Sequence, residues 1–139
     1  LAYSVYSAVQ SFVDSGFLMV YAATTPDRAR ETVRLVLDEF RALAEHGPTP
    51  EEVRVAREHL KGSLMLSLES TSSRMSNLAR QEIYFGRNYG LRELLRTIDR
   101  VTPEHLHDVS RELFDGVRPG LAAVGRTRSL RIREEELSL

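Results

Sequence analysis

The chain has no cysteine among its 139 residues, and this absence excludes several kinds of chemistry at once. Without thiols there is no disulfide framework, no cysteine nucleophile and no cysteine-based zinc site. No apolar run approaches the roughly 20 residues that a membrane helix needs, so we expect no membrane partner. The compartment is not determined by these absences, and a cytoplasmic location is the default expectation.

Charge of one sign is also missing. The formal net charge is -1, and acidic and basic residues are interspersed along the segments with helical spacing. A basic stripe that could follow a phosphate backbone is absent, so we expect no nucleic-acid partner. Hydrophobic residues make up 42% of the chain, which is enough for a modest core in one compact domain.

The sequence contains no G-x-S-x-G elbow, no P-loop and no G-x-G-x-x-G motif. Its histidines do not form a metal site either, because a catalytic zinc needs about three protein ligands. His105 and His107 are two residues apart, so on a helix they point to different sides. Glu58 and His59 resemble the end of an H-x-x-E-H motif, but Val55 stands where the first histidine would be. We therefore expect no catalytic residue, metal ligand or cofactor in this chain.

Strand-like sequence opens the chain. Residues 1–13 alternate valine and tyrosine with small polar residues, and 17–23 continue this composition after Asp14-Ser15-Gly16, which predicts a β-hairpin. Two strands are marginal alone, so the hairpin needs a larger sheet. Since a natural N-terminus is usually loose and polar, we expect Leu1 to be the edge of a fragment of a longer protein.

Helical signals dominate the middle of the chain. Thr25-Pro26-Asp27 predicts the N-terminus of a first helix, and Gly47-Pro48 predicts its end. His46 stands just before this end, where the helix dipole favours a protonated imidazole. Thr49 with Glu52 predicts a second N-terminus. Further helices are expected after the break at 69–73 up to Gly86, over 91–98, and from Thr102-Pro103 to about Phe114. Residues 118–125 predict one last strand, and 126–139 a charged tail.

This order predicts an α+β fold: an antiparallel sheet, made of the hairpin and a C-terminal strand, packed by several amphipathic helices on one face. The motifs also resemble a known family in their order and wording. "LAYSVYSAVQSFVDSGFLMVYAATTPDRARETVRLVLDEF", "LAEHGPTPEEVRVAREHLKGSLMLSLESTSSRMSNLARQEIYFGR" and "LLRTIDRVTPEHLHDVSRELF" resemble the C-terminal half of the insulinase/pitrilysin-type zinc metallopeptidases, or inverzincins, which include the mitochondrial processing peptidases. The resemblance covers residues 1–125, which would be a partial C-terminal peptidase-family domain.

The resemblance implies a division of labour between two related halves. In this family an N-terminal half carries H-x-x-E-H and a downstream glutamate ligand, while a zinc-free C-terminal half closes over the peptide substrate. Zinc polarises the peptide carbonyl and the motif glutamate activates water. The chain looks like the later portion of the zinc-free half, so zinc is expected in the N-terminal half of the parent protein. That half, or a second subunit, would be its partner, and the earlier strands of its own sheet should be missing.

One residue acquires a role through the resemblance. The family's C-terminal half carries an arginine followed shortly by a tyrosine, which hold the substrate, and alignment of "LAY" places Tyr3 on that tyrosine. The matching arginine would lie upstream of Leu1. The alternative for Tyr3 is cross-strand packing, as for the other hairpin aromatics.

Three functions remain open at this point. The parent is expected to be a zinc-dependent metallopeptidase that cleaves peptides, with this chain as part of the chamber wall. The first alternative is a non-catalytic structural or substrate-presenting subunit of the same family, and the second is a plain interaction module. We also expect the fragment to self-associate through its unprotected hairpin.

Overall fold

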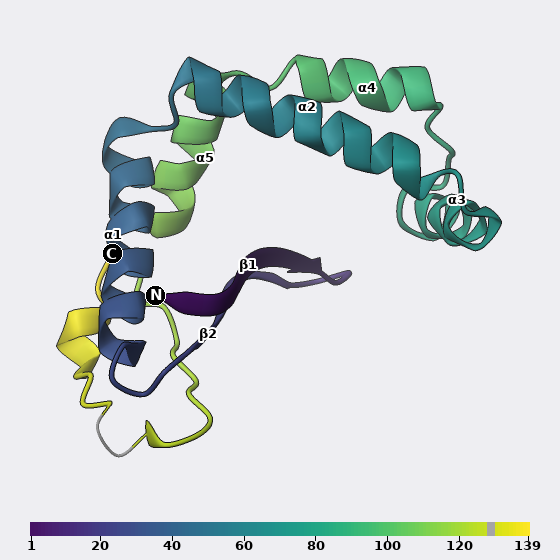
Figure 1. Cartoon of the computed structure of the whole chain (residues 1–139). Coiled ribbons are helices and arrows are strands. Elements are labelled where there is room, and N and C mark those ends of the chain that lie inside the picture. The colour runs from purple at the N-terminus through teal and green to yellow at the C-terminus, as the bar shows by residue number, and fades with distance from the viewer. Residues whose placement is uncertain (128–129) are drawn as a thin grey trace. The chain divides into compact units, whose positions relative to one another are not determined.

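The computed structural model describes residues 1–127 and 130–139. Within these ranges the chain has one two-stranded sheet and five α-helices, which confirms the α+β class (Figure 1). The elements are β1 (Ala2–Ser11), β2 (Gly16–Thr24), α1 (Ala29–His46), α2 (Pro50–Ser67), α3 (Thr71–Phe85), α4 (Leu91–Asp99), α5 (Pro103–Phe114) and the 3-10 helix η2 (Glu134–Leu137). They divide into two compact units, one of residues 1–47 with 107–139 and one of residues 48–106.

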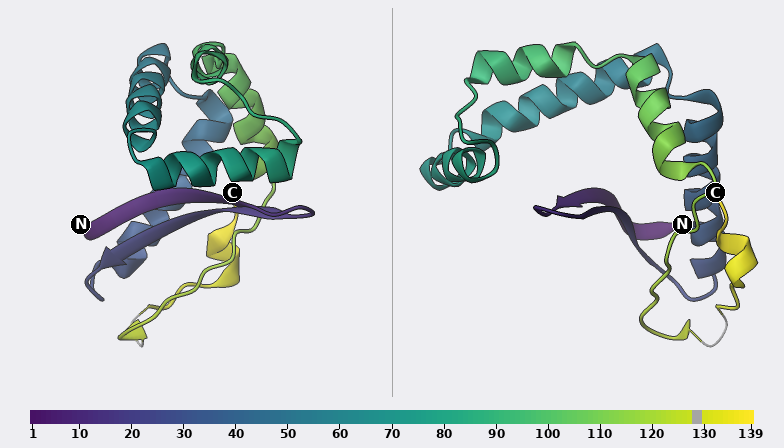
Figure 2. Two further views of the ribbon diagram at one scale, coloured as in Figure 1. Left: turned by 90° about the vertical axis from the view of Figure 1, so that its right-hand side faces the viewer. Right: turned by 180° about the vertical axis from the view of Figure 1, so that it is seen from behind.

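The predicted hairpin is confirmed. Strands β1 and β2 run antiparallel and lie side by side in every view (Figure 2). The backbone N–H of Phe12 donates to the carbonyl of Ser15 at 2.8 Å and closes the turn. Tyr6 stacks on Tyr21 across the strands with ring centroids 5.0 Å apart, so aromatic pairs stabilise the ladder as the sequence pattern indicated.

Helix α1 begins later than predicted. The turn over residues 25–28 is closed by the N–H of Arg28, which donates to the Thr25 carbonyl at 3.0 Å. The helix proper starts at Ala29, with Arg28 as an N-cap that makes no side-chain capping bond. The prediction of Thr25 as the cap was therefore wrong. Thr25 belongs to the turn that the Arg28 N–H closes, and this turn precedes the helix.

Residues 118–125 were predicted to form a C-terminal strand, and this prediction was also wrong. Residues 117–124 adopt neither helix nor strand, and Val124 is fully exposed. The composition suits a strand, but a strand exists only through hydrogen bonds to a neighbour. Within the described ranges the sheet consists of β1 and β2 alone, so Leu121 to Val124 have no ladder to join.

Helices α1 and α5 form the core of the first unit. Leu37 and Phe114 are buried, and Phe40 stacks on Phe114 with ring centroids 4.5 Å apart. The residues of α5 that belong to this unit lie alongside α1 (Figure 1). Helix α1 also contacts β2, which precedes it in the chain.

In the second unit, the helix ends follow the sequence signals. Thr49 and Glu52 form a complete capping box at the start of α2. Ser70 caps α3 by accepting from the Ser73 N–H, and Gly86 ends α3 in the left-handed conformation. The predicted break between α2 and α3 is thereby confirmed, since a serine cap there competes with continued helix.

Polar contacts join α2 to α4. Arg57 donates from its guanidinium to the carbonyl of Val101, just beyond α4. Lys61 Nζ lies 2.7 Å from Glu58 and 2.9 Å from Asp99. Val53 is the buried apolar residue of α2. None of the helices described is both long and apolar enough to cross a membrane.

Candidate functional site

Tyr3 occupies an irregular position in β1. Ala2 pairs with Thr24 and Ser4 pairs with Ala23, so two neighbouring residues of β2 face three residues of β1. Tyr3 is therefore the extra residue of a β-bulge. A bulge breaks the alternation of side chains and turns one of them in a new direction. The Tyr3 ring is accordingly not packed in a cross-strand pair and is 82% exposed.

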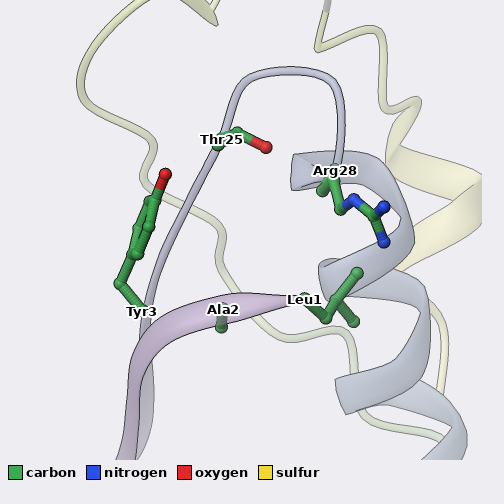
Figure 3. A pocket seen from close by; sticks show the side chains of 5 residues that line it. All are labelled: Leu1, Ala2, Tyr3, Thr25 and Arg28. Carbon is green, nitrogen blue, oxygen red and sulfur yellow. The ribbon is translucent and has the colours of Figure 1, made fainter.

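The bulge places Tyr3 at the edge of a hollow of about 330 Å³ where β1 approaches the start of α1. Figure 3 shows Tyr3 and Arg28 on opposite sides of this hollow, with Thr25 on the loop between β2 and α1. The Thr24 hydroxyl donates to the Leu1 carbonyl at 2.7 Å and holds the first residues of β1 in place. The lining residues are Leu1, Ala2, Tyr3, Thr25 and Arg28.

The turn before α1 determines the electrostatics of the hollow. The Thr25 side chain hydrogen-bonds to Asp27 and lowers the pKa of its carboxyl, assisted by the Asp27 backbone and, to a lesser extent, by the charge of Arg28. Asp27 therefore stays ionised at neutral pH. Arg28 makes no side-chain hydrogen bond or ion pair with any residue that the structure describes. Its guanidinium is available to an incoming acceptor.

A phenol hydroxyl and a guanidinium on two sides of one hollow suit a carbonyl or carboxylate group. Both side chains can donate to oxygen, and the arginine does so in a forked geometry. Neither is a nucleophile activated by a neighbouring base. The arrangement can bind and orient a group that presents an oxygen acceptor.

The histidines are dispersed. His107 Nε2 lies 3.0 Å from the Ala44 carbonyl, and His105 Nδ1 accepts from the Thr102 N–H at 3.4 Å, so the two rings have different partners as predicted. His46 pairs loosely with Glu45 at 3.7 Å, and the hydrogen bond to a last-turn carbonyl of α1 comes from His107. Across the described residues, no three His, Asp or Glu side chains are grouped to hold a metal ion.

Arg28 is the residue of this hollow that the sequence did not single out. Its only local signal is its place after Thr-Pro-Asp, which indicated a helix start and not a binding group. The bulge that redirects Tyr3 leaves no signal in the sequence at all. Both features depend on how β1 pairs with β2, and that register is a property of the folded hairpin.

The fold recurs in a solved structure. A chain of Complex III2 from Candida albicans superposes with a TM-score of 0.71 at 21% identity, over 78% of this chain and 26% of that chain. Residues 1–60 match the family model described as the Peptidase M16 inactive domain. The fold class is thus α+β, and the first 60 residues are similar to a domain that the family description calls inactive.

Named relatives agree with this class. An uncharacterized zinc protease of Mycobacterium tuberculosis is 42% identical over 137 residues, which are 99% of this chain and 31% of the relative. The mitochondrial-processing peptidase subunit alpha of Neurospora crassa is 31% identical over 111 residues, 77% of this chain and 19% of that protein. The chain belongs to the M16 peptidase family, as part of a non-catalytic C-terminal domain. It spans less than a third of the length of these relatives.

Proposed function

We propose that the chain forms part of the wall of a peptide-binding chamber in a zinc-dependent metallopeptidase, and that Tyr3 contacts the substrate there. The observation that carries this proposal is the bulge, which takes Tyr3 out of the ladder and leaves it beside a hollow that Arg28 also lines, in a chain related to zinc proteases. In this role the chain binds and orients the peptide through Tyr3. The bond cleavage takes place elsewhere in the protein.

The zinc belongs to another part of the parent protein in this proposal. The described residues offer no group that fits the ion, and the family model that matches this chain is named inactive. The metal and its water-activating glutamate would be supplied by an N-terminal half, on the same chain or on a second subunit. That half is the first partner we propose, and a peptide is the substrate.

A second function has a specific observation in its favour. The chain is related to both the alpha and the beta subunits of mitochondrial-processing peptidase, and its fold occurs in a chain of Complex III2. It would then be a structural or substrate-presenting subunit. The sequence upstream of Leu1 discriminates the two proposals: H-x-x-E-H with a downstream glutamate supports the peptidase, and a degenerate version supports the subunit.

The substrate contact is tested by Tyr3→Phe in the parent enzyme. Loss of one hydrogen bond to substrate, worth roughly 0.5 to 1.5 kcal/mol, should lower kcat/KM about 2- to 10-fold. The matched control is Tyr6→Phe. Tyr6 lies in the same strand as Tyr3 but stacks on Tyr21 of β2, so this change should leave the kinetics unchanged. Equal kinetics for the wild type and Tyr3→Phe over several peptides would leave Tyr3 with a packing role only.

The location of the zinc is tested on the chain itself. We expect the purified 139-residue chain to retain no stoichiometric zinc after dialysis and to cleave no quenched fluorescent peptide. Metal analysis and the peptide assay together decide this. One tightly held zinc per chain, lost in a His59 or His105 variant, would contradict the proposed division between the halves.

A further inference from the structure

The C-terminal segment of residues 130–139 lies along α1 like a strap (Figure 1; Figure 2). We call it the strap below. Arg30 on α1 donates to Glu136 at 2.6 Å, and Arg41, three turns further along the helix, donates to the carbonyl of Ser138 at 2.6 Å. The N–H of Leu139 donates to the Val117 carbonyl at 3.0 Å. The strap therefore has several anchors in the first unit.

The surface under the strap has a definite chemistry. A groove of about 310 Å³ separates the strap from α1, and Val33 and the buried Leu37 form its apolar floor. Three arginines and one aspartate of α1 line it, and the aspartate is already paired with Arg41 at 2.7 Å. Facing them, the strap contributes one apolar and one acidic residue. The full lining is Arg30, Val33, Arg34, Leu37, Asp38, Arg41, Ile132 and Glu136.

Charge complementarity identifies what this surface accepts. The α1 side carries an excess of positive charge, and Arg34 makes no ion pair with any described residue. Glu134, Glu135 and Glu136 are the acidic run of the strap. The strap also carries two arginines, which reduce its net negative charge. One of them, Arg133, forms ion pairs with its own neighbours Glu135 and Glu136. The hydrogen bond from the Arg133 backbone, followed by the hydrogen bond and the charge of Arg30, lowers the pKa of Glu136, so this carboxylate is ionised at neutral pH.

We propose that this face of α1 is an interaction surface for an acidic peptide segment in which an aliphatic residue precedes a run of glutamates, and that the chain's own strap occupies it in cis. The ion pairs of the strap are solvent-exposed, and such pairs are individually weak and sensitive to salt. Residues 117–124, which lead to the strap, form no helix or strand. The strap can therefore leave without unfolding an α-helix or a strand, and an acidic peptide in trans replaces it.

The experiment uses the full chain and a fluorescein-labelled peptide with the sequence of residues 130–139. Glu136→Arg in the chain removes the main anchor of the strap and should increase peptide affinity at least fivefold over the wild type. Arg30→Glu should abolish binding of this peptide, and a peptide with the Glu136→Arg change should restore it. A peptide with all three glutamates changed to glutamine is the matched control and should bind weakly. Circular dichroism at 222 nm verifies that each variant keeps its helices.

A second measurement does not depend on destabilised variants. The chain is free of cysteine, so Ser138→Cys provides a single spin-label site on an otherwise wild-type chain. The label should be immobilised at 50 mM salt and should become mobile when the unlabelled peptide is added. A label that is mobile at every salt concentration, or peptide binding that Arg30→Glu leaves unchanged, would overturn the proposal. A dimer that Arg30→Glu disperses would assign the groove to a second copy and would equally overturn a peptide partner.

Discussion

At the scale of single residues, Gly47 and His107 form a contact that joins two distant parts of the chain. Gly47 ends α1 with φ 68 and ψ 174, a conformation that is open only to glycine. A Cβ atom at this position would lie 2.9 Å from the His107 Cβ. The same histidine hydrogen-bonds to the Ala44 carbonyl in the last turn of α1. Because glycine has no side chain, His107 can lie close to Gly47 and hydrogen-bond to a carbonyl in the last turn of α1.

This contact predicts an unusually costly glycine substitution. Gly47→Ala should lower the free energy of unfolding by about 1 to 3 kcal/mol, because it adds backbone strain and displaces His107. Gly62→Ala is the matched control, since Gly62 lies inside α2 with no atom near its missing Cβ. That change should raise stability by about 0.5 to 1 kcal/mol. Urea unfolding followed by circular dichroism measures both, and equal effects would contradict the structural role of Gly47.

The residue scale is also where sequence reasoning falls short. Gly47 was predicted as a helix end from its neighbours. Its contact with His107, 60 positions away, has no signal in the sequence around either residue. His46 was expected to favour the end of α1, and the structure gives the carbonyl contact to His107. Tyr3 was singled out by resemblance alone. The bulge that makes it available is a matter of register and could not be read from its position.

At the scale of secondary-structure elements, the start of α2 is the best-defined helix end in the chain. The Glu52 N–H donates to the Thr49 hydroxyl oxygen at 3.2 Å, and the Thr49 N–H donates back to the Glu52 carboxylate at 2.8 Å. The hydrogen bonds from the Thr49 backbone and side chain lower the pKa of Glu52 below its ordinary value of 4.5. The stability that this helix end contributes therefore depends on pH.

The sign of that linkage gives a prediction. A carboxyl with a lowered folded-state pKa stabilises the fold fully above its unfolded value of about 4.5, and this stabilisation is lost as the pH falls through the lower folded pKa. Glu52→Gln should therefore be less stable than the wild type at pH 7 and should approach it as the pH falls below the folded-state pKa of Glu52. Glu69→Gln, a change at an exposed residue without an ion pair among the described residues, is the control. A stability difference independent of pH would contradict the linkage.

Elements with local signals were predicted well, and elements with non-local requirements were not. Helices have their caps and breaks written in neighbouring residues, as at Thr49, Ser70 and Gly86, and the structure confirms these ends. The β-hairpin is equally local. The strand expected over 118–125 needs a partner strand, which the sequence of the segment cannot guarantee. The start of α1 was misplaced because residues 25–28 form a turn, closed by the Arg28 N–H and the Thr25 carbonyl, before the helix begins.

At the scale of the whole molecule, exposed apolar surface is the dominant property. Both faces of the hairpin carry large apolar residues, which is typical of strands inside a covered sheet. Among the described residues, β1 pairs with β2 alone and each strand has an open edge. The exposed large residues of the hairpin are Tyr3, Val5, Tyr6, Val9, Phe12, Val13, Phe17, Leu18, Met19 and Tyr21. Such a surface favours association.

We accordingly predict that the 139-residue chain self-associates at micromolar concentrations, most simply as a two-fold dimer. Burial of a few hundred Å² of apolar surface, at about 25 cal/mol per Å², supplies several kcal/mol. Val9→Lys on β1 should weaken the dimer, while Leu66→Lys on α2 is the control for a helix surface. Light scattering over a dilution series measures this. A monodisperse monomer at high micromolar concentration would contradict the role given to the hairpin.

The pairing of Lys61 with Glu58 and Asp99 has a practical consequence. Lys61 bears the only side-chain amine of the chain, and these hydrogen bonds, to Glu58 first and then to Asp99, raise its pKa. Only the neutral amine attacks an acylating reagent, so Lys61 should react slowly while α4 stays on α2. Mass spectrometry of acetylated chain would then separate one side-chain site from the α-amino group. The acetylation rate of the Lys61 amine therefore reports how often α4 separates from α2, and no engineered probe is needed.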